Sequence, residues 1–176
     1  MAGNRHKSAY IAVCRGILLS AAWAATGCTN GNYMEVYDLP RAGWAEDQAV
    51  VFTFRRDSAA FCEADGEWID ITMRHRADFP YAALPLEVKG VTPDKRFWTD
   101  TIAFPLGALS EDGTYRWAGR AYSNHYDITH RYRSGIRYAL SGEYALSVRQ
   151  LTGQDTLRGI LSIGVIASGT QAADIR

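Results

Sequence analysis

The 176-residue chain contains few cysteines and histidines, and its two kinds of charge balance. Its three cysteines show no zinc-site spacing, and its four histidines include no His-Glu-x-x-His motif. The glycine patterns of dinucleotide-binding folds and of phosphate-binding P-loops are also missing. These absences argue against a zinc enzyme, a dinucleotide-dependent enzyme and a P-loop hydrolase. We therefore expect no metal, no cofactor and no enzymatic activity.

The chain also lacks a long hydrophobic run. A membrane-spanning helix needs about 20 apolar residues, whereas the apolar run at 17–25 has about half that length. Three basic residues precede this run, and small residues follow it as far as Cys28. That order is typical of a secretory signal peptide, which we assign to residues 1–27.

The residues Ala25-Thr26-Gly27-Cys28 resemble the lipobox of bacterial lipoproteins, in which small residues precede a cysteine that is acylated and becomes the new N-terminus. Cys14 is the competing acceptor, but it follows the bulky Val13 and no apolar run precedes it. We expect Cys28 to carry acyl chains such as palmitate, and residues 28–33 to form a tether. Two or more chains on one residue would give a stable membrane anchor.

Removal of residues 1–27 would leave a slightly acidic chain. That segment holds three basic and no acidic residues, so 16 Lys and Arg would face 19 Asp and Glu over 149 residues. Nucleic-acid-binding domains are usually basic, so we expect no nucleic-acid partner. With Cys28 acylated, Cys62 would have no cysteine to pair with. The fold would then depend on its hydrophobic core.

The rest of the chain alternates short β-like runs with turn residues. In Trp68–His75, for example, Ile69, Ile71 and Met73 share one face and polar residues the other, as in a half-buried antiparallel strand. The only helical candidate is the short Ser58–Ala64 segment. We predict strands at Met34–Leu39, Ala49–Phe54, Trp68–His75, Leu84–Val88, Phe97–Phe104, Tyr115–Ala121, Asp127–Tyr132, Gly142–Leu151 and Ile160–Ala167.

Strands at this spacing favour one all-β domain. We predict an antiparallel β-sandwich, jelly-roll or immunoglobulin-like, over residues 34–170, followed by a tail at 171–176. A closed barrel is the alternative. A transmembrane barrel is disfavoured, because the runs are short and too few of them lack a charge on the face that lipid would cover.

Polar residues at two places could carry chemistry. His125 and Asp127 with His130 could hold a metal, although polar residues on a turn and strand are more often simply solvated. An enzyme would require two of Asp70, His75, His125 and Asp127 to converge in one pocket. The sequence shows no motif that favours either arrangement.

Two clusters are candidates for binding a partner. The aromatic cluster contains Trp44, Phe79-Pro80-Tyr81, Trp98, Trp117 and Tyr122. The second cluster contains Arg131, Tyr132 and Arg133, with Arg137 and Tyr138 nearby. Most of the aromatics also suit a core, and the arginines also suit a charge-protected edge strand. We select Phe79, Tyr81, Arg131, Tyr132 and Arg133 as candidate partner-binding residues.

Several segments in order resemble the GldH family, the gliding-motility lipoproteins of Bacteroidota. The most specific are Arg74-His75 followed by Phe79-Pro80-Tyr81 and Leu84, and Leu157-Arg158-Gly159-Ile160 followed by Gly164. Others include Val51-Phe52-Thr53-Phe54, Phe104-Pro105-Leu106 and Gly113-Thr114-Tyr115-Arg116-Trp117-Ala118-Gly119. Together they cover most of the domain.

The resemblance implies a non-enzymatic lipoprotein that assists the gliding-motility and type IX secretion-associated machinery of the cell envelope. It implies a lipid anchor in the outer membrane with the domain on the periplasmic face, and protein partners in the envelope. The residues directly after Cys28 are not acidic, which favours the periplasmic orientation. A periplasmic or surface carbohydrate-binding module is the alternative, and it would require a platform of coplanar, exposed aromatic rings.

Overall fold

The computed structural model describes residues 32–58 and 66–168, and every regular element in these ranges is a β-strand. The strands are β1 (Tyr33–Asp38), β2 (Trp44–Ala45), β3 (Val50–Arg56), β4 (Glu67–Arg76), β5 (Ala83–Val91), β6 (Phe97–Pro105), β7 (Gly107–Leu109), β8 (Tyr115–Trp117), β9 (Arg120–Ala121), β10 (His125–Ile136), β11 (Gly142–Gln150), β12 (Thr156–Leu157) and β13 (Ile160–Ser168). The predicted helix at Ser58–Ala64 lies, except for Ser58, outside the described residues, as do Cys28 and Cys62.

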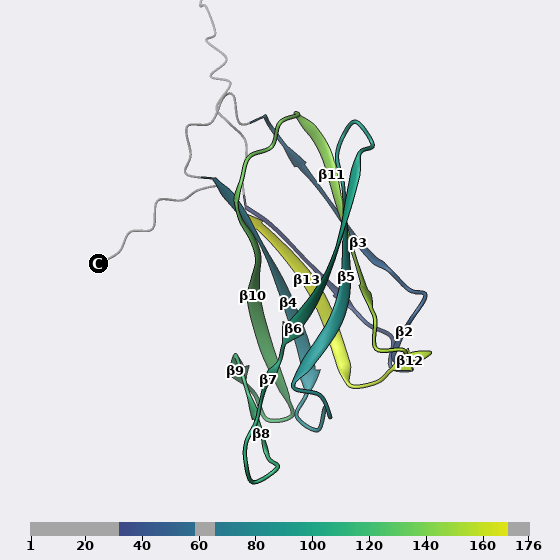
Figure 1. Cartoon of the computed structure of the whole chain (residues 1–176), viewed down its shortest axis with the longest axis vertical. Helices are drawn as coiled ribbons and strands as arrows, with labels where there is room; N and C mark the ends of the chain where they lie inside the picture. The colour runs from purple at the N-terminus through teal and green to yellow at the C-terminus, as the bar shows by residue number, and fades with distance from the viewer. Residues whose placement is uncertain (1–31, 59–65, 169–176) are drawn as a thin grey trace, which may run out of the picture.

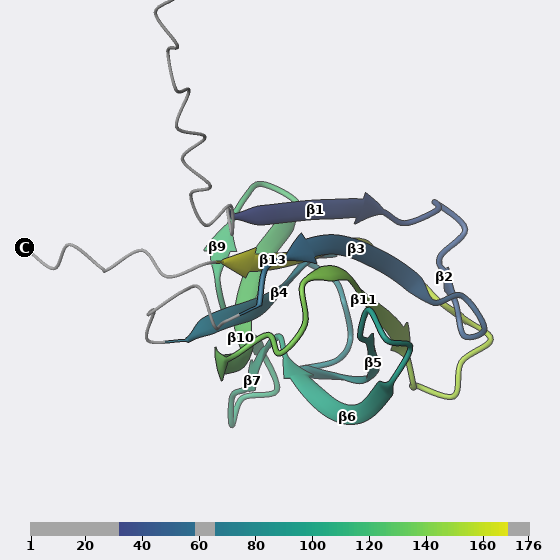
Figure 2. The same cartoon turned by 90° about the horizontal axis from the view of Figure 1, so that it is seen from above.

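Two antiparallel sheets pack face to face. One has the order β1-β13-β4-β10-β9 and the other β3-β11-β5-β6, and both can be followed in Figures 1 and 2. The pairs β2–β12 and β7–β8 extend the domain beyond the sheets. This arrangement confirms the predicted all-β sandwich. No helix among the described residues is long and apolar enough to cross a membrane.

The sandwich forms because its central strands alternate as a half-buried strand should. In β4, Ile69, Ile71 and Met73 are buried between the sheets and the residues between them face outward. β3 and β11 show the same alternation, with Phe52 and Leu146 almost completely buried. These inward rows form one continuous core, so burial of apolar surface holds the two sheets together.

Differences from the predicted strands concentrate at the short elements. The predicted strand Tyr115–Ala121 is two strands, β8 and β9, because Gly119 between them has a φ of +76°. A Cβ on Gly119 would lie 2.2 Å from the carbonyl oxygen of Asp127, so only glycine fits there. β10 is longer than predicted, and its pairing with β4 shifts register twice near its C-terminal end.

The register defines two ends of the sandwich. β1 begins at Tyr33, one residue inside the predicted tether, and Tyr33 pairs with Ala167 near the end of β13. The "tether end" comprises Tyr33, Arg56, Glu67, Val91, Phe97, Ile136, Gly142 and Ser168. The "distal end" comprises Asp38, Val50, Arg76, Ala83, Pro105, His125, Gln150 and Ile160. In Figure 1, the start of β11 lies at the top and β2, β12 and β8 lie toward the bottom.

Candidate functional site

A cleft of about 750 Å³ opens at the distal end. Three chain segments line it: the turn after β1 at 39–43, the connection after β4 at 76–81 and the stretch at 154–161 that contains β12 and leads into β13. The cleft therefore lies at the end of the sandwich away from the predicted lipid tether. A volume of this size is in the usual range of ligand-binding pockets.

Backbone hydrogen bonds hold the three segments together. The amide of Leu39 donates to the carbonyl of Leu161 at 2.9 Å, and the amide of Arg76 donates to the carbonyl of Gly159 at 2.8 Å. The β2–β12 pair joins Trp44 to Leu157 in register. Because main-chain bonds fix the walls, the cleft is a built feature of the fold rather than a gap between loose loops.

Phe79 forms the floor of the cleft. Its side chain is 1% exposed, and its ring packs against Gly159 so closely that a Cβ there would lie 2.9 Å from Cδ2 of Phe79. Gly159 also has a φ of +94°, which disfavours any other residue. Phe79 is thus a core residue that supports the cleft, and a partner could not reach its ring directly.

Tyr81 forms part of the wall and is 39% exposed. Its hydroxyl accepts a hydrogen bond of 2.5 Å from Nε2 of Gln154. The loop that carries Gln154 is organised by the fully buried Gln150, whose amide nitrogen donates to the Gln154 carbonyl and whose amide oxygen accepts from the backbone amide of Thr152. Of the two aromatics predicted to bind a partner in this block, Tyr81 is the one that a partner can reach.

Three guanidinium groups line the cleft against one carboxylate. Arg76 forms a bidentate ion pair with Asp78, with bonds of 2.8 and 2.7 Å, and this lowers the pKa of Asp78. Arg41 and Arg158 are exposed, and no carboxylate of residues 32–58 or 66–168 lies within ion-pairing distance of either. The cleft therefore carries excess positive charge in a chain with balanced charges.

Behind the cleft floor lies a cluster of rings around His75. The imidazole is fully buried, 4.6 Å from the ring centre of Trp117 and 5.7 Å from that of Phe79. Its Nδ1 lies 2.7 Å from the Arg76 carbonyl, which can only accept, so we assign the proton to Nδ1. Burial lowers the pKa of His75, which keeps the ring neutral at pH 7.

Stability is expected to fall as the pH drops below about 6.5, the ordinary histidine pKa in the unfolded chain. The unfolded chain binds a proton on His75 at a higher pH than the folded protein does, so acid favours unfolding through this window. Urea unfolding of wild type and His75→Gln between pH 5 and 7.5 tests this. In His75→Gln, the free energy of unfolding should depend less on pH, because the contribution of His75 is lost. His125→Gln, a change on the outer face, should keep the contribution of His75. An unchanged pH dependence in His75→Gln would contradict the assignment.

The three predicted partner-binding residues of the second cluster, Arg131, Tyr132 and Arg133, all have partners within the chain. Arg131 pairs with Asp70 across β4 and β10 and stacks over Trp68. The Tyr132 hydroxyl and the Arg133 guanidinium both donate to Asp100 of β6, which lowers the pKa of that carboxyl. These side chains therefore tie β10 to both sheets.

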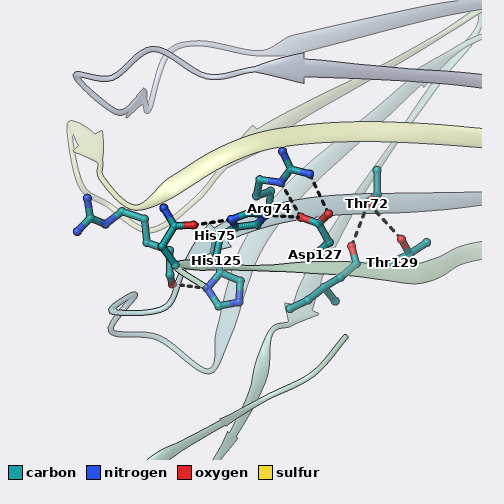
Figure 3. A network of polar contacts seen from close by, with 9 residues as sticks. Thr72, Arg74, His75, His125, Asp127 and Thr129 are labelled. Atoms are coloured by element: carbon teal, nitrogen blue, oxygen red, sulfur yellow. Dashed lines mark hydrogen bonds and ion pairs between the residues drawn. The ribbon is translucent and has the colours of Figure 1, made fainter. Parts of the chain in front are cut away.

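Of the polar residues considered for metal binding or catalysis, His125 and Asp127 lie close together, but none of Asp70, His75, His125 and Asp127 lines the cleft. Asp127 forms a bidentate pair with Arg74 at 2.6 and 2.8 Å, and His125 lies 3.9 Å from its carboxylate (Figure 3). His130 faces the other side of β10 and packs on Phe104. Within the described ranges, no three His, Cys, Asp or Glu residues form a group that could hold a metal.

Sequence reasoning missed Arg41, Arg158 and Gln154 as cleft residues. Arg41 follows a strand-ending proline and Gln154 lies in a polar turn, a context in which such residues are usually just solvated. Arg158 was visible only as part of the segment that carries the family resemblance. The distance between segments 39–43, 76–81 and 154–161 along the chain hid their meeting in space.

Comparison with known proteins finds a family match that includes the three segments lining the cleft. Residues 31–166 match the family model described as GldH lipoprotein. This range contains all three walls of the cleft and all but the last two residues of β13. Among curated proteins, none matches the chain. The family match covers well over half of the sequence, and the chain therefore belongs to the GldH lipoprotein family.

Proposed function

We propose that this chain is a non-enzymatic accessory component of the gliding-motility and type IX secretion-associated machinery. In this proposal, acyl chains on Cys28 anchor it in the outer membrane and the sandwich faces the periplasm. The distal cleft then docks an acidic surface of an envelope protein. Membrane anchoring follows from membership of the lipoprotein family, whereas the membrane, the residue and the partner are parts of the proposal.

The observation that carries the docking role is the meeting of two distant segments. Phe79-Pro80-Tyr81 and Leu157-Arg158-Gly159-Ile160 are the most specific elements of the family resemblance, and both line one cleft. A purely structural role would explain Phe79 and Gly159, which are packed together. It does not explain why Arg158 and Tyr81, both exposed, line the same cleft.

The position of the cleft supports the same role. Tyr33 marks the tether end, and the cleft lies at the opposite end of β1 and β13. An anchored domain would therefore present the cleft away from its own membrane, where a protein in the periplasm can reach it. Arg41 and Arg158, which form no ion pair with any described residue, favour carboxylates as the groups recognised, since guanidinium and carboxylate form strong bidentate contacts.

The carbohydrate-binding alternative is disfavoured because only Tyr81 and Tyr122 of the six aromatic residues that suggested it are exposed. Trp44 and Phe79 are buried, and Trp98 and Trp117 are half-buried. The indole nitrogens of Trp44, Trp98 and Trp117 donate to the Gln48 carbonyl, the Tyr132 hydroxyl and the Ala77 carbonyl, respectively. These rings are held by contacts inside the domain, as expected of core residues.

Site-specific crosslinking tests the docking role. We expect a photoreactive phenylalanine at position 81 to crosslink the full-length lipoprotein to an envelope protein in the host. Reversing both cleft charges, Arg41→Glu with Arg158→Glu, should reduce this adduct at least fivefold, because the recognised carboxylates would be repelled. The matched control is Arg116→Glu, an exposed arginine on β8 at the same end that does not line the cleft. An adduct that survives the cleft reversal, or no protein adduct at all, would contradict the docking role.

A further inference from the structure

A second pocket opens between the two sheets at the tether end. It has a volume of about 210 Å³ and lies between the β5–β6 turn and the β10–β11 connection. Its walls are mainly apolar, formed by Phe54, Ile69, Trp98, Tyr138, Tyr144 and Leu146. At about 30 Å³ per water molecule, the space is equivalent to roughly seven waters, which suits a slender chain better than a drug-sized molecule.

The wall rings are largely apolar, although the buried Tyr138 hydroxyl has no hydrogen-bond partner among the described residues. Tyr144 packs 4.7 Å from Tyr138 and 6.3 Å from Phe54, measured between ring centres. The Tyr144 hydroxyl is already bonded to the Leu140 carbonyl at 2.8 Å. Burial raises the pKa of Tyr138 to about 12, so its ring stays neutral. A pocket with such walls favours an apolar occupant.

The lining also includes three arginines. Arg133 pairs with Asp100 and Arg96 pairs with Asp94, each at 2.7 Å. Arg137 is exposed and has no carboxylate partner among the described residues. Arg137 therefore supplies an uncompensated positive charge beside an apolar space.

The length of the tether places this end of the domain near the membrane. Cys28 and Tyr33 are five residues apart, a separation that an extended chain cannot stretch beyond about 17 Å. Given the proposed acylation of Cys28, the tether end stays within that distance of the lipid. An amphipathic anion from the membrane could then reach the pocket.

We propose that the tether-end pocket binds the acyl chain of an amphipathic anion, with the charged head group at Arg137. The occupant is a free fatty acid or an anionic membrane lipid, both of which combine a hydrocarbon chain with a negative head. The inference uses the proposed lipidation of Cys28 only to place the pocket near the membrane. Binding of the lipid by the pocket does not require the anchor. The GldH lipoprotein would thus hold a lipid at one end and a protein at the other.

Calorimetric titration of the soluble mature chain, residues 28–176 with Cys28→Ser, tests the proposal with fatty acids below their micelle concentration. All core residues lie within this chain. We expect saturable binding of one octanoate per protein. Each buried methylene strengthens affinity about fourfold, so octanoate, with two more methylenes, should bind roughly fifteenfold more tightly than hexanoate.

Three variants separate chain from head group. Arg137→Glu should weaken octanoate binding at least tenfold but leave octanol binding unchanged, because octanol has no charge. Ala139→Trp, at an exposed position of the lining, should block both ligands. Arg116→Glu, an exposed arginine on β8 that lines neither the cleft nor this pocket, is the control and should change neither. Octanoate binding that is absent, or that survives both pocket variants, would overturn the proposal.

Vesicles distinguish the two sources of the ligand. Co-sedimentation of the same chain with phosphatidylcholine and phosphatidylglycerol vesicles, lost in Arg137→Glu, supports a membrane lipid as the occupant. Octanoate binding without such co-sedimentation supports a free fatty acid. Absence of octanoate binding overturns the lipid pocket whatever the vesicles show. The cleft crosslinking and the acylation of Cys28 are separate experiments, and their outcomes do not depend on this one.

Discussion

Replacing Glu67 by glutamine is expected to destabilise the domain by about 3–5 kcal/mol, because it leaves a buried guanidinium without its counter-charge. Arg56 and Glu67 are 4% and 7% exposed, and Nε of Arg56 lies 2.8 Å from the Glu67 carboxylate. Arg56 also donates to the Ala167 carbonyl at 2.6 Å and lies over the rings of Phe54 and Tyr138. One ion pair thus joins β3, β4 and β13 at the tether end.

Urea unfolding of the soluble mature chain measures this effect. The matched control is Asp70→Asn, which breaks the pair between Asp70 and Arg131, whose side chains are 15% and 50% exposed, and should cost about 1 kcal/mol. The double variant Arg56→Met with Glu67→Leu should recover much of the loss, since a buried pair can often be replaced by apolar residues. A Glu67→Gln effect no larger than that of Asp70→Asn would contradict the structural role of the buried pair.

Truncating Phe79 to alanine should cost a similar amount, about 3–5 kcal/mol, because it leaves a cavity under the distal cleft. The ring is 1% exposed and packs against His75, Tyr81 and Gly159. The adjacent Tyr81→Ala removes a partly exposed ring and should cost less than about 1 kcal/mol. Unfolding curves of the two variants therefore separate the core residue from the cleft residue.

Crosslinking measures the effect of Tyr81→Ala on partner docking, whereas unfolding measures its effect on stability. Photoreactive phenylalanine at Thr156, an exposed residue of the cleft lining, should still report the docked partner when Tyr81 is intact. Adding Tyr81→Ala should weaken that adduct although the domain remains folded. If Tyr81→Ala instead proved as destabilising as Phe79→Ala, the division between floor and wall would be wrong.

The fold could be predicted well where the local pattern of the sequence determines structure. Strands such as β4 and β11 alternate apolar and polar residues over their full length, and that alternation identifies the buried face. The strands β2 and β12 have two residues each, too few for any alternation to be read. Gly119 divided a predicted strand because its conformation depends on the nearby Asp127 carbonyl, a contact that only the fold creates.

The candidate site was predicted only in part, for the same reason. The Phe79-Pro80-Tyr81 block was recognised, but which of its rings is exposed depends on Gly159, 80 residues further along the chain. Arg131, Tyr132 and Arg133 were selected as an exposed mixture of arginine and tyrosine. Their partners Asp70 and Asp100 lie on other strands, so the pairing became visible only in three dimensions.

The two ends of the sandwich together give a consistent account of the domain. The tether end carries the buried pair Arg56–Glu67 and an apolar pocket beside Arg137. The distal end carries a cleft with two arginines, Arg41 and Arg158, that have no carboxylate partner in the described part of the chain. In the proposed orientation, the first end meets lipid and the second meets protein. This division depends on the attachment of lipid at Cys28.

The most direct test of that account is the intact mass of the protein extracted from membranes, compared between wild type and Cys28→Ser. We predict a mass that equals residues 28–176 plus acyl chains, and loss of that species in the variant. An unacylated product cleaved at another residue, or an uncleaved chain, would contradict the lipid anchor and with it the orientation of both ends.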